Sequence, residues 1–157
     1  ELKFEGEYLN NKLNGEGKIY YNDGQSYIEG NYKNGKINGK GKQYKYGYLI
    51  FEGEYLNGKR NGKGKEYKNG KIIFNGEYLN GKRSGKGKEY NYDGELEFEG
   101  EYLNGKRNGH GKEYYLKYGN IKFEGEYLNG KRNGKGIEYH FNKVVFKGEY
   151  LNDKRIE

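Results

Sequence analysis

The chain has no cysteine, proline, methionine or tryptophan. Without cysteine it can form neither a disulfide framework nor a Cys-ligated metal site. No apolar run approaches the roughly 20 residues of a membrane-spanning helix, and no signal peptide is visible. Only 31% of the 157 residues are hydrophobic, and aromatic residues alone make up 17% of the chain. A thick aliphatic core is therefore excluded.

One segment recurs along the whole chain, and its fullest copy is FEGEYLNGKRNGKG, beginning at Phe51. The seven copies, of which the last is truncated, are 23 to 25 residues apart and begin at Phe4, Ile28, Phe51, Phe74, Phe98, Phe123 and Phe146. A fixed period in this range indicates a repeat array, in which each unit buries its apolar face against its neighbours. We therefore expect residues 1–157 to be one array. The missing initiator methionine and the truncated last copy suggest a piece of a longer protein.

The repeat predicts β-strands. The 29 glycines are too dense for helices of ordinary length. Phe51, Gly53 and Tyr55 alternate with acidic residues, so they share one face of a strand. Asn57-Gly58 then supplies the strongest short hairpin signal, because both residues of a type I′ turn need positive φ.

A two-residue turn at Asn57-Gly58 also predicts the pairing. It sets Phe51 opposite Gly64 and Glu52 opposite Lys63, so that rings cover glycines on one face and charges pair on the other. If Gly64 also faces Phe74, the same rule places the return loops at 21–24, 45–47, 68–70, 91–94, 115–119 and 140–142. The predicted fold is all-β: an elongated, single-layer, twisted antiparallel meander of 13 strands built from tandem β-hairpins.

These residues resemble MORN repeats (membrane occupation and recognition nexus), whose pattern is approximately Tyr-x-Gly-x-aromatic-x-x-Gly-x-x-x-Gly-x-Gly. Two of the copies that match it are Phe51, Gly53, Tyr55, Gly58, Gly62 and Gly64, and Phe74, Gly76, Tyr78, Gly81, Gly85 and Gly87. The resemblance implies a non-catalytic cytoplasmic module that works as a scaffold at the membrane or the cytoskeleton. It also implies binding of protein partners or of anionic lipids such as phosphoinositides, and self-association.

A basic edge is the first candidate surface. Each copy carries basic residues just after its constant turn: Lys59, Arg60, Lys82, Arg83, Lys106, Arg107, Lys131 and Arg132. With the net charge of +7, such a row could hold anionic lipid headgroups. The alternative is a solvated edge on which lysine discourages unwanted strand pairing.

A tyrosine face is the second candidate surface, because tyrosine buries a large area and keeps a polar tip. Its column comprises Tyr32, Tyr55, Tyr78, Tyr102 and Tyr127. We expect a protein partner on this face or on the loops; the alternative for the face is that the rings only cover glycines.

No catalytic constellation recurs in phase, so we expect neither an enzyme nor a bound cofactor or metal. His110 stands where sister copies have lysine, which favours a tolerated surface substitution. Nucleic acid is disfavoured as a partner because glutamates alternate with the basic residues and would repel phosphates. The terminal strands, expected at 1–9 and 146–152, would lack a neighbour and could support end-to-end self-association.

Overall fold

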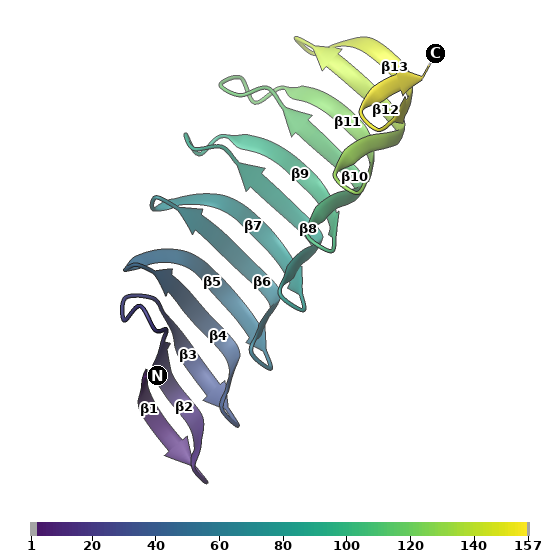
Figure 1. The fold of residues 1–157 in the computed structure, drawn as a ribbon. Helices are drawn as coiled ribbons and strands as arrows, with labels where there is room; N and C mark the ends of the chain where they lie inside the picture. Colours follow the sequence, from purple (N-terminus) through teal and green to yellow (C-terminus); the bar gives the residue numbers. More distant parts are fainter. Residues whose placement is uncertain (1–2, 157) are drawn as a thin grey trace. The chain divides into compact units, whose positions relative to one another are not determined.

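The structure is a computed structural model that describes residues 3–156. Within these residues the chain forms 14 strands and no helix, and the strands pair in sequence order in one open antiparallel sheet (Figure 1). This confirms the all-β meander of hairpin repeats. The predicted number of 13 strands was one too few, because the chain turns back once more after Leu151.

The chain divides into two compact units. Unit 1 comprises Glu1–Ile72 and Tyr78–Gly81, and unit 2 comprises Ile73–Glu77 and Lys82–Glu157, so that strand β7 (Lys71–Leu79) contributes to both. The other strands of unit 1 are β1 (Lys3–Leu9), β2 (Lys12–Tyr20), β3 (Tyr27–Lys33), β4 (Lys36–Lys45), β5 (Tyr48–Leu56) and β6 (Lys59–Lys68). Those of unit 2 are β8 (Lys82–Tyr90), β9 (Leu96–Leu103), β10 (Lys106–Tyr114), β11 (Ile121–Leu128), β12 (Lys131–His140), β13 (Lys143–Leu151) and β14 (Lys154–Ile156).

The hairpin turns form where the sequence places them. Asn57 and Gly58 have φ of 50° and 86°, and Leu56 pairs with Lys59 across the turn. Both dihedrals lie in the left-handed region that a type I′ turn requires. In unit 2 these turns lie along one margin of the sheet and the loops along the opposite margin (Figure 1). We call the two sides the turn margin and the loop margin.

The pairing beyond the turn differs from the expected register. Gly53 faces Gly64 and Phe51 faces Glu66, whereas a simple hairpin would set Phe51 opposite Gly64. Glu52 faces Lys65 instead of Lys63, and their side chains form an ion pair of 3.6 Å. The expected pairing of opposite charges across the strands is therefore present, but the partner of Glu52 is the lysine two residues after the expected one.

A bulge causes this shift. Between the paired positions Tyr55–Arg60 and Gly53–Gly64, β5 has a single residue, Glu54, whereas β6 has three. Gly62, in the middle of the three, has a φ of 93°. The carboxylate of Glu54 occupies the space in which a side chain of residue 62 would stand. The glycine is needed both for the backbone conformation and for the room that it leaves.

The shift brings glycines together across the strands. In unit 2, Gly100 pairs with both Gly87 and Gly111, and the Phe98 ring lies over Gly100 and Gly111 where a Cβ would stand. The expectation that aromatic rings cover glycines is thus confirmed, although each ring covers a glycine pair diagonally. We call the side that carries Phe98 and Tyr102 the aromatic face, and the side that carries Glu99 and Glu101 the polar face.

The return loops lie in the expected places but have other lengths. The observed loops are 21–26, 46–47, 69–70, 91–95, 115–120 and 141–142. The three short ones are two-residue turns with positive φ at both positions, one residue shorter than predicted. Among the longer loops, 21–26 is closed by Asp23, whose carboxylate accepts hydrogen bonds from the backbone N and the hydroxyl of Ser26, both at 2.7 Å.

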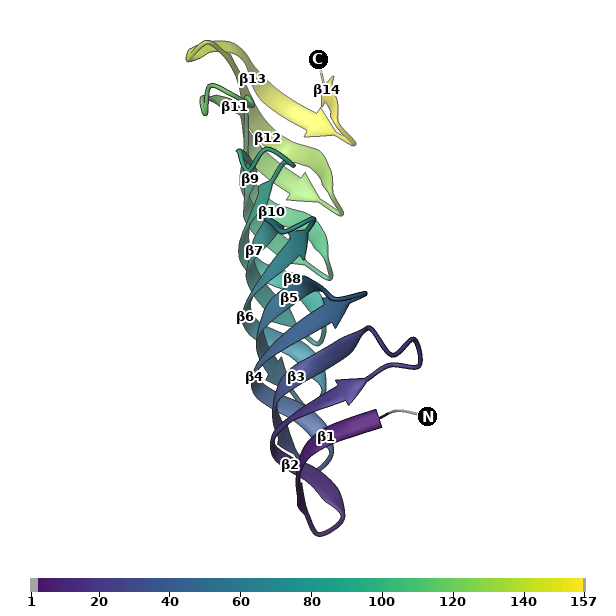
Figure 2. The same cartoon turned by 90° about the vertical axis from the view of Figure 1, so that its left-hand side faces the viewer.

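At the C-terminal end, the strand that was expected at 146–152 is not an edge along its whole length. It is β13, and the short β14 pairs with Glu149, Tyr150 and Leu151 (Figure 2). The chain can add this strand because Asn152 and Asp153 form one more turn with positive φ. End-to-end association through the sheet edges stays a prediction.

Candidate interaction surfaces

The aromatic face of unit 2 is a layer of interlocked rings. Phe98 and Phe123 are fully buried. The Phe98 ring centre lies 5.8 Å from that of Tyr102 and 5.2 Å from that of Tyr127, edge-to-face in both cases. This arrangement sets the positive edge of one ring against the negative face of another. Because Tyr102 and Tyr127 belong to consecutive repeats, Phe98 joins the two.

Arginines close this layer from outside. The Arg107 guanidinium lies 4.0 Å from the Phe98 ring centre, and that of Arg132 lies 4.1 Å from the Phe123 ring centre. Arg132 also donates hydrogen bonds from Nε and Nη2 to Glu113, at 3.0 and 2.7 Å. Such a bidentate pair fixes the guanidinium in the orientation that the ring contact needs.

The tyrosine hydroxyls complete the network. Tyr102 donates to Glu89 and Tyr127 donates to Glu113, both at 2.7 Å. Burial by itself would raise the pKa of Glu113, but the hydrogen bonds from Arg132 and Tyr127 hold this pKa below its usual range. For Tyr127, burial and the hydrogen bond to Glu113 both raise the pKa. The carboxylate therefore stays charged and the phenol neutral at physiological pH.

The five candidate tyrosines of the partner face are all buried in the structure. Tyr32, Tyr78, Tyr102 and Tyr127 are 4% exposed and Tyr55 is 5% exposed. A partner that docks on this side would meet mainly the arginine and glutamate side chains that lie over the rings. Binding of a partner to the tyrosine face stays a prediction. In the structure these rings have little surface that a partner could contact.

The basic edge is divided between the two faces. Successive strand residues point to opposite sides of a sheet, so each arginine turns to the aromatic face and each lysine to the polar face. Arg107 is engaged with Phe98 and Glu89, whereas Lys106 is exposed and has no ion-pair partner within residues 3–156. The residues accessible to a ligand are therefore the lysines Lys59, Lys82, Lys106 and Lys131.

A leucine column accompanies these lysines. In unit 2 it comprises Leu103, Leu128 and Leu151, which are 53%, 50% and 55% exposed. Leu103 pairs with Lys106 and Leu128 with Lys131 at the turn margin of the polar face. The alternation of the strand could have identified them, because a recurring leucine on an otherwise charged face has no core to enter.

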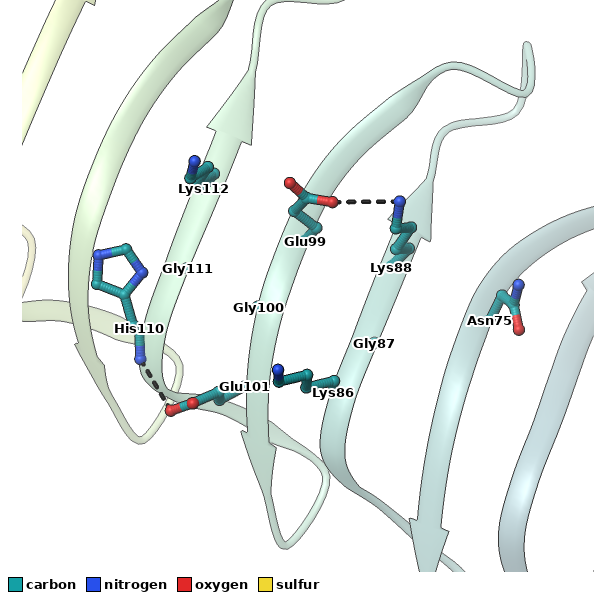
Figure 3. A pocket seen from close by; sticks show the side chains of 10 residues that line it. All are labelled: Asn75, Lys86, Gly87, Lys88, Glu99, Gly100, Glu101, His110, Gly111 and Lys112. Carbon is teal, nitrogen blue, oxygen red and sulfur yellow. Dashed lines mark hydrogen bonds and ion pairs between the residues drawn. The ribbon is translucent and has the colours of Figure 1, made fainter.

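A groove crosses the polar face of unit 2 (Figure 3). It has a volume of 460 Å³ and a floor of paired glycines, which includes Gly100. Charged side chains form its two sides; Lys88 is paired with Glu99 at 3.2 Å, and Glu101 accepts a hydrogen bond from the backbone N of His110 at 3.1 Å. Since cations and anions both line it, the groove has no marked preference for ligands of one charge.

At the loop margin of unit 2, further apolar side chains are exposed. Tyr118 is 70%, Phe141 66% and Val144 58% exposed, and the Tyr118 and Phe141 rings lie 6.4 Å apart. These residues belong to connections of unequal length. They lack the regular spacing of the leucine column.

No group of three or more potential metal ligands occurs within residues 3–156. His110 is exposed on the polar face, 3.9 Å from Glu124. No helix in the described part of the chain is long and apolar enough to cross a membrane.

The family model of the MORN repeat matches the chain six times, at residues 4–26, 29–46, 51–72, 74–95, 98–117 and 123–142. The chain belongs to the MORN-repeat family. A comparison with curated proteins gives no match. MORN repeats are in general non-catalytic modules for protein or membrane interaction. Their pattern specifies the rings and glycines of the aromatic face together with the turn glycine and the bulge glycine; the exposed leucines and lysines lie outside the positions of the pattern.

Proposed function

We propose that this MORN array is a non-catalytic scaffold that binds a protein partner through the turn margin of its polar face. The carrying observation is the leucine column beside unpaired lysines. Each leucine is at least half exposed, and each recurs at the same place in its repeat. Exposed apolar residues that form a regular row are typical of a binding surface, whereas scattered ones need no explanation.

The structure of the aromatic face supports the polar face as the binding surface, because its rings are not accessible to a partner. Its rings are covered by arginines, and the arginines are held by glutamates. A ligand on that side would have to compete with bidentate ion pairs. On the polar face, by contrast, Lys106 and Lys131 are free to pair with an acidic partner.

The test is quantitative affinity capture from cells of the source organism, with cross-linking and mass spectrometry. The tagged chain would be compared with a variant carrying Leu103→Ser, Leu128→Ser and Leu151→Ser. A matched control carries Tyr118→Ser, Phe141→Ser and Val144→Ser, which remove apolar groups from the loop margin that are more exposed than the leucines. We expect specific partners to be lost from the first variant only. Partners retained by the first variant, or lost equally from both, would contradict the proposal.

Peripheral binding to an anionic membrane is the second candidate function. It is favoured by the unpaired lysines and by the net charge of +7, since each basic residue near such a surface contributes roughly 1 kcal/mol. Co-sedimentation with phosphoinositide vesicles at physiological salt would be measured for the wild type and for a variant with Lys59, Lys82, Lys106 and Lys131 changed to Glu. The arginines stay unchanged, because reversing their charge would disrupt the aromatic face. Binding that the variant loses supports this candidate, and no binding by the wild type excludes it.

A further inference from the structure

The turns along the turn margin of unit 2 are hydrogen-bonded to the preceding repeats. The turns at Asn129 and Asn152 each make two hydrogen bonds to the preceding repeat, and at the turn before them Gly105 donates its backbone N–H to the Arg83 carbonyl at 2.9 Å. Gly130 donates its backbone N–H to the Arg107 carbonyl at 2.8 Å, and Asn129 donates its own to the Asn108 side chain at 3.3 Å. The turn at Asn152 repeats this arrangement with Asn133, at 3.4 Å. The leucine and lysine that flank each turn are therefore held at a fixed distance from those of the next.

That distance is two strand spacings. Leu103, Leu128 and Leu151 lie on β9, β11 and β13, and neighbouring strands are about 4.8 Å apart, so the leucines recur about every 10 Å. Seven residues of an α-helix rise about 10.5 Å. A helix laid across the strands can therefore set one apolar side chain against each leucine, if its apolar residues are seven positions apart.

The lysines supply a second spacing. They lie on the intervening strands β10, β12 and β14, so Leu and Lys alternate along the margin at about 4.8 Å. Helix residues three or four positions apart are about 5–6 Å apart on one face. An acidic residue three or four positions after each apolar one would thus reach Lys106, Lys131 and Lys154. None of these lysines has an ion-pair partner within residues 3–156.

Two acidic groups near this margin are already engaged with the backbone. Glu101 and Glu126 are the nearest carboxylates on the same strands as Leu103 and Leu128. Each is turned into a bulge, where it accepts a hydrogen bond at 3.1 Å from the backbone N of His110 or of Lys135. Lys106, Lys131 and Lys154 are thus the charges that flank the three leucines directly across the strands, while Glu149 and Asp153 add two carboxylates beside Leu151.

We propose that the turn margin of unit 2 binds an acidic amphipathic α-helix that lies across the strands, with an apolar residue every seven positions and an acidic residue three or four positions after each. This rests on the proposed function and names the class of partner. A membrane would also take leucines beside lysines, but a fluid lipid surface has no preference for spacing, and the fixed interval is what favours a helix.

The experiment uses the full chain and a designed, fluorescently labelled helical peptide of three heptads. The peptide carries Leu at the first and Glu at the fourth position of each heptad. The control peptide has the same composition and comparable helicity, with its leucines five positions apart. Fluorescence anisotropy at physiological salt should show at least about tenfold tighter binding of the heptad peptide, which corresponds to about 1.4 kcal/mol. Higher salt should weaken it, since the lysines are exposed.

Two protein variants locate the site. Leu103→Ser with Leu128→Ser should abolish the difference between the peptides, whereas Tyr118→Ser with Val144→Ser, at the loop margin, should preserve it. Equal binding of both peptides, no binding of either, or unchanged binding by the leucine variant would overturn the helix proposal. The helix proposal would also be overturned if the protein bound anionic vesicles through Leu103 and Leu128 and the heptad peptide did not compete with the vesicles. In each case leucine-dependent partners in the capture experiment would still support the proposed function, so the two failures are distinguishable.

Discussion

The first repeats of unit 1 and the repeats of unit 2 cover the same glycine and aromatic layer with different chemistry. In unit 2, Arg132 lies over Phe123 and pairs with Glu113 and Glu138. In unit 1, Ile37 stands at the arginine position, is 4% exposed, and packs on Gly30 and Gly41. One backbone thus accepts two kinds of cover: an arginine that lies over the phenylalanine ring, or an isoleucine that itself contacts the glycines.

Where the apolar arrangement of the first repeats gives way to the ionic one, the hydroxyl of Tyr55 is left without a hydrogen-bond partner within the described residues. Gln43 stands where later repeats have Glu66, Glu89 and Glu113, and it accepts a hydrogen bond from Arg60 at 2.9 Å. The Tyr78 hydroxyl, in contrast, donates to Glu66 at 2.7 Å. The ionic cover is therefore a set of mutually dependent groups, and the apolar cover is not.

The largest effect on stability is expected when an arginine that lies over a ring in unit 2 is replaced by an apolar residue. Arg132→Leu imitates the apolar repeats but leaves Glu113 and Glu138 each without one cation. Removing one partner of a largely buried pair typically costs about 3–5 kcal/mol, and we expect about 3 kcal/mol in urea unfolding followed by circular dichroism. Adding Glu113→Leu should recover part of the loss. If Arg132→Leu were neutral, the two covers would be interchangeable residue by residue.

A second comparison concerns the glycine rows. An alanine at Gly111 would place its Cβ in the Phe98 ring, which is fully buried, whereas one at Gly17 would meet Phe4, which is only partly buried. Overpacking a core typically costs about 1–3 kcal/mol. We expect Gly111→Ala near the upper end and Gly17→Ala near the lower end, measured by urea unfolding. Equal costs would show that the Phe98 ring moves as freely as that of Phe4.

Acid should affect unit 2 before the first repeats of unit 1. Burial alone would raise the pKa of Glu89 and of Glu138, but hydrogen bonds from Arg107 and Arg155 and from tyrosines lower both. A carboxyl whose folded pKa is lowered contributes stability above its unfolded pKa of about 4.3, and this is lost as pH falls through the folded value. Hydrogen exchange between pH 7 and 3 should show Tyr127 and Tyr150 losing protection before Tyr32. The reverse order would contradict the comparison.

The smallest expected effect is an increase in stability. Gln43→Glu would give the Tyr55 hydroxyl an acceptor and Arg60 a charged partner, which completes the network of the later repeats. We expect about 1 kcal/mol of added stability at pH 7, and its loss at a pH low enough to protonate the new carboxylate. Tyr55→Phe is the control, because removing the unpartnered hydroxyl should cost little and should reduce the gain from Gln43→Glu.

The repeat was enough to predict the strands, the Asn-Gly turns and the alternation of faces. It did not predict the register, because the bulge at Gly62 depends on a carboxylate from the facing strand, Glu54, entering the space that the glycine leaves. The division of Lys106 and Arg107 between two faces could have been foreseen from strand alternation. The partners of Arg107 could not, since Glu89 lies 18 residues away in sequence.

The sequence by itself determined the architecture: a period of 23 to 25 residues, a turn of left-handed residues in each copy and glycines in phase with aromatic rings permit only stacked antiparallel hairpins. Only the tertiary structure decided which of the repeated side chains remain accessible. Tyrosine and arginine are polar at their tips and could have faced solvent. The tyrosines are buried and the arginines half-buried, because rings, guanidinium groups and carboxylates from different repeats satisfy one another on the aromatic face, whereas the leucines and lysines of the opposite face remain exposed.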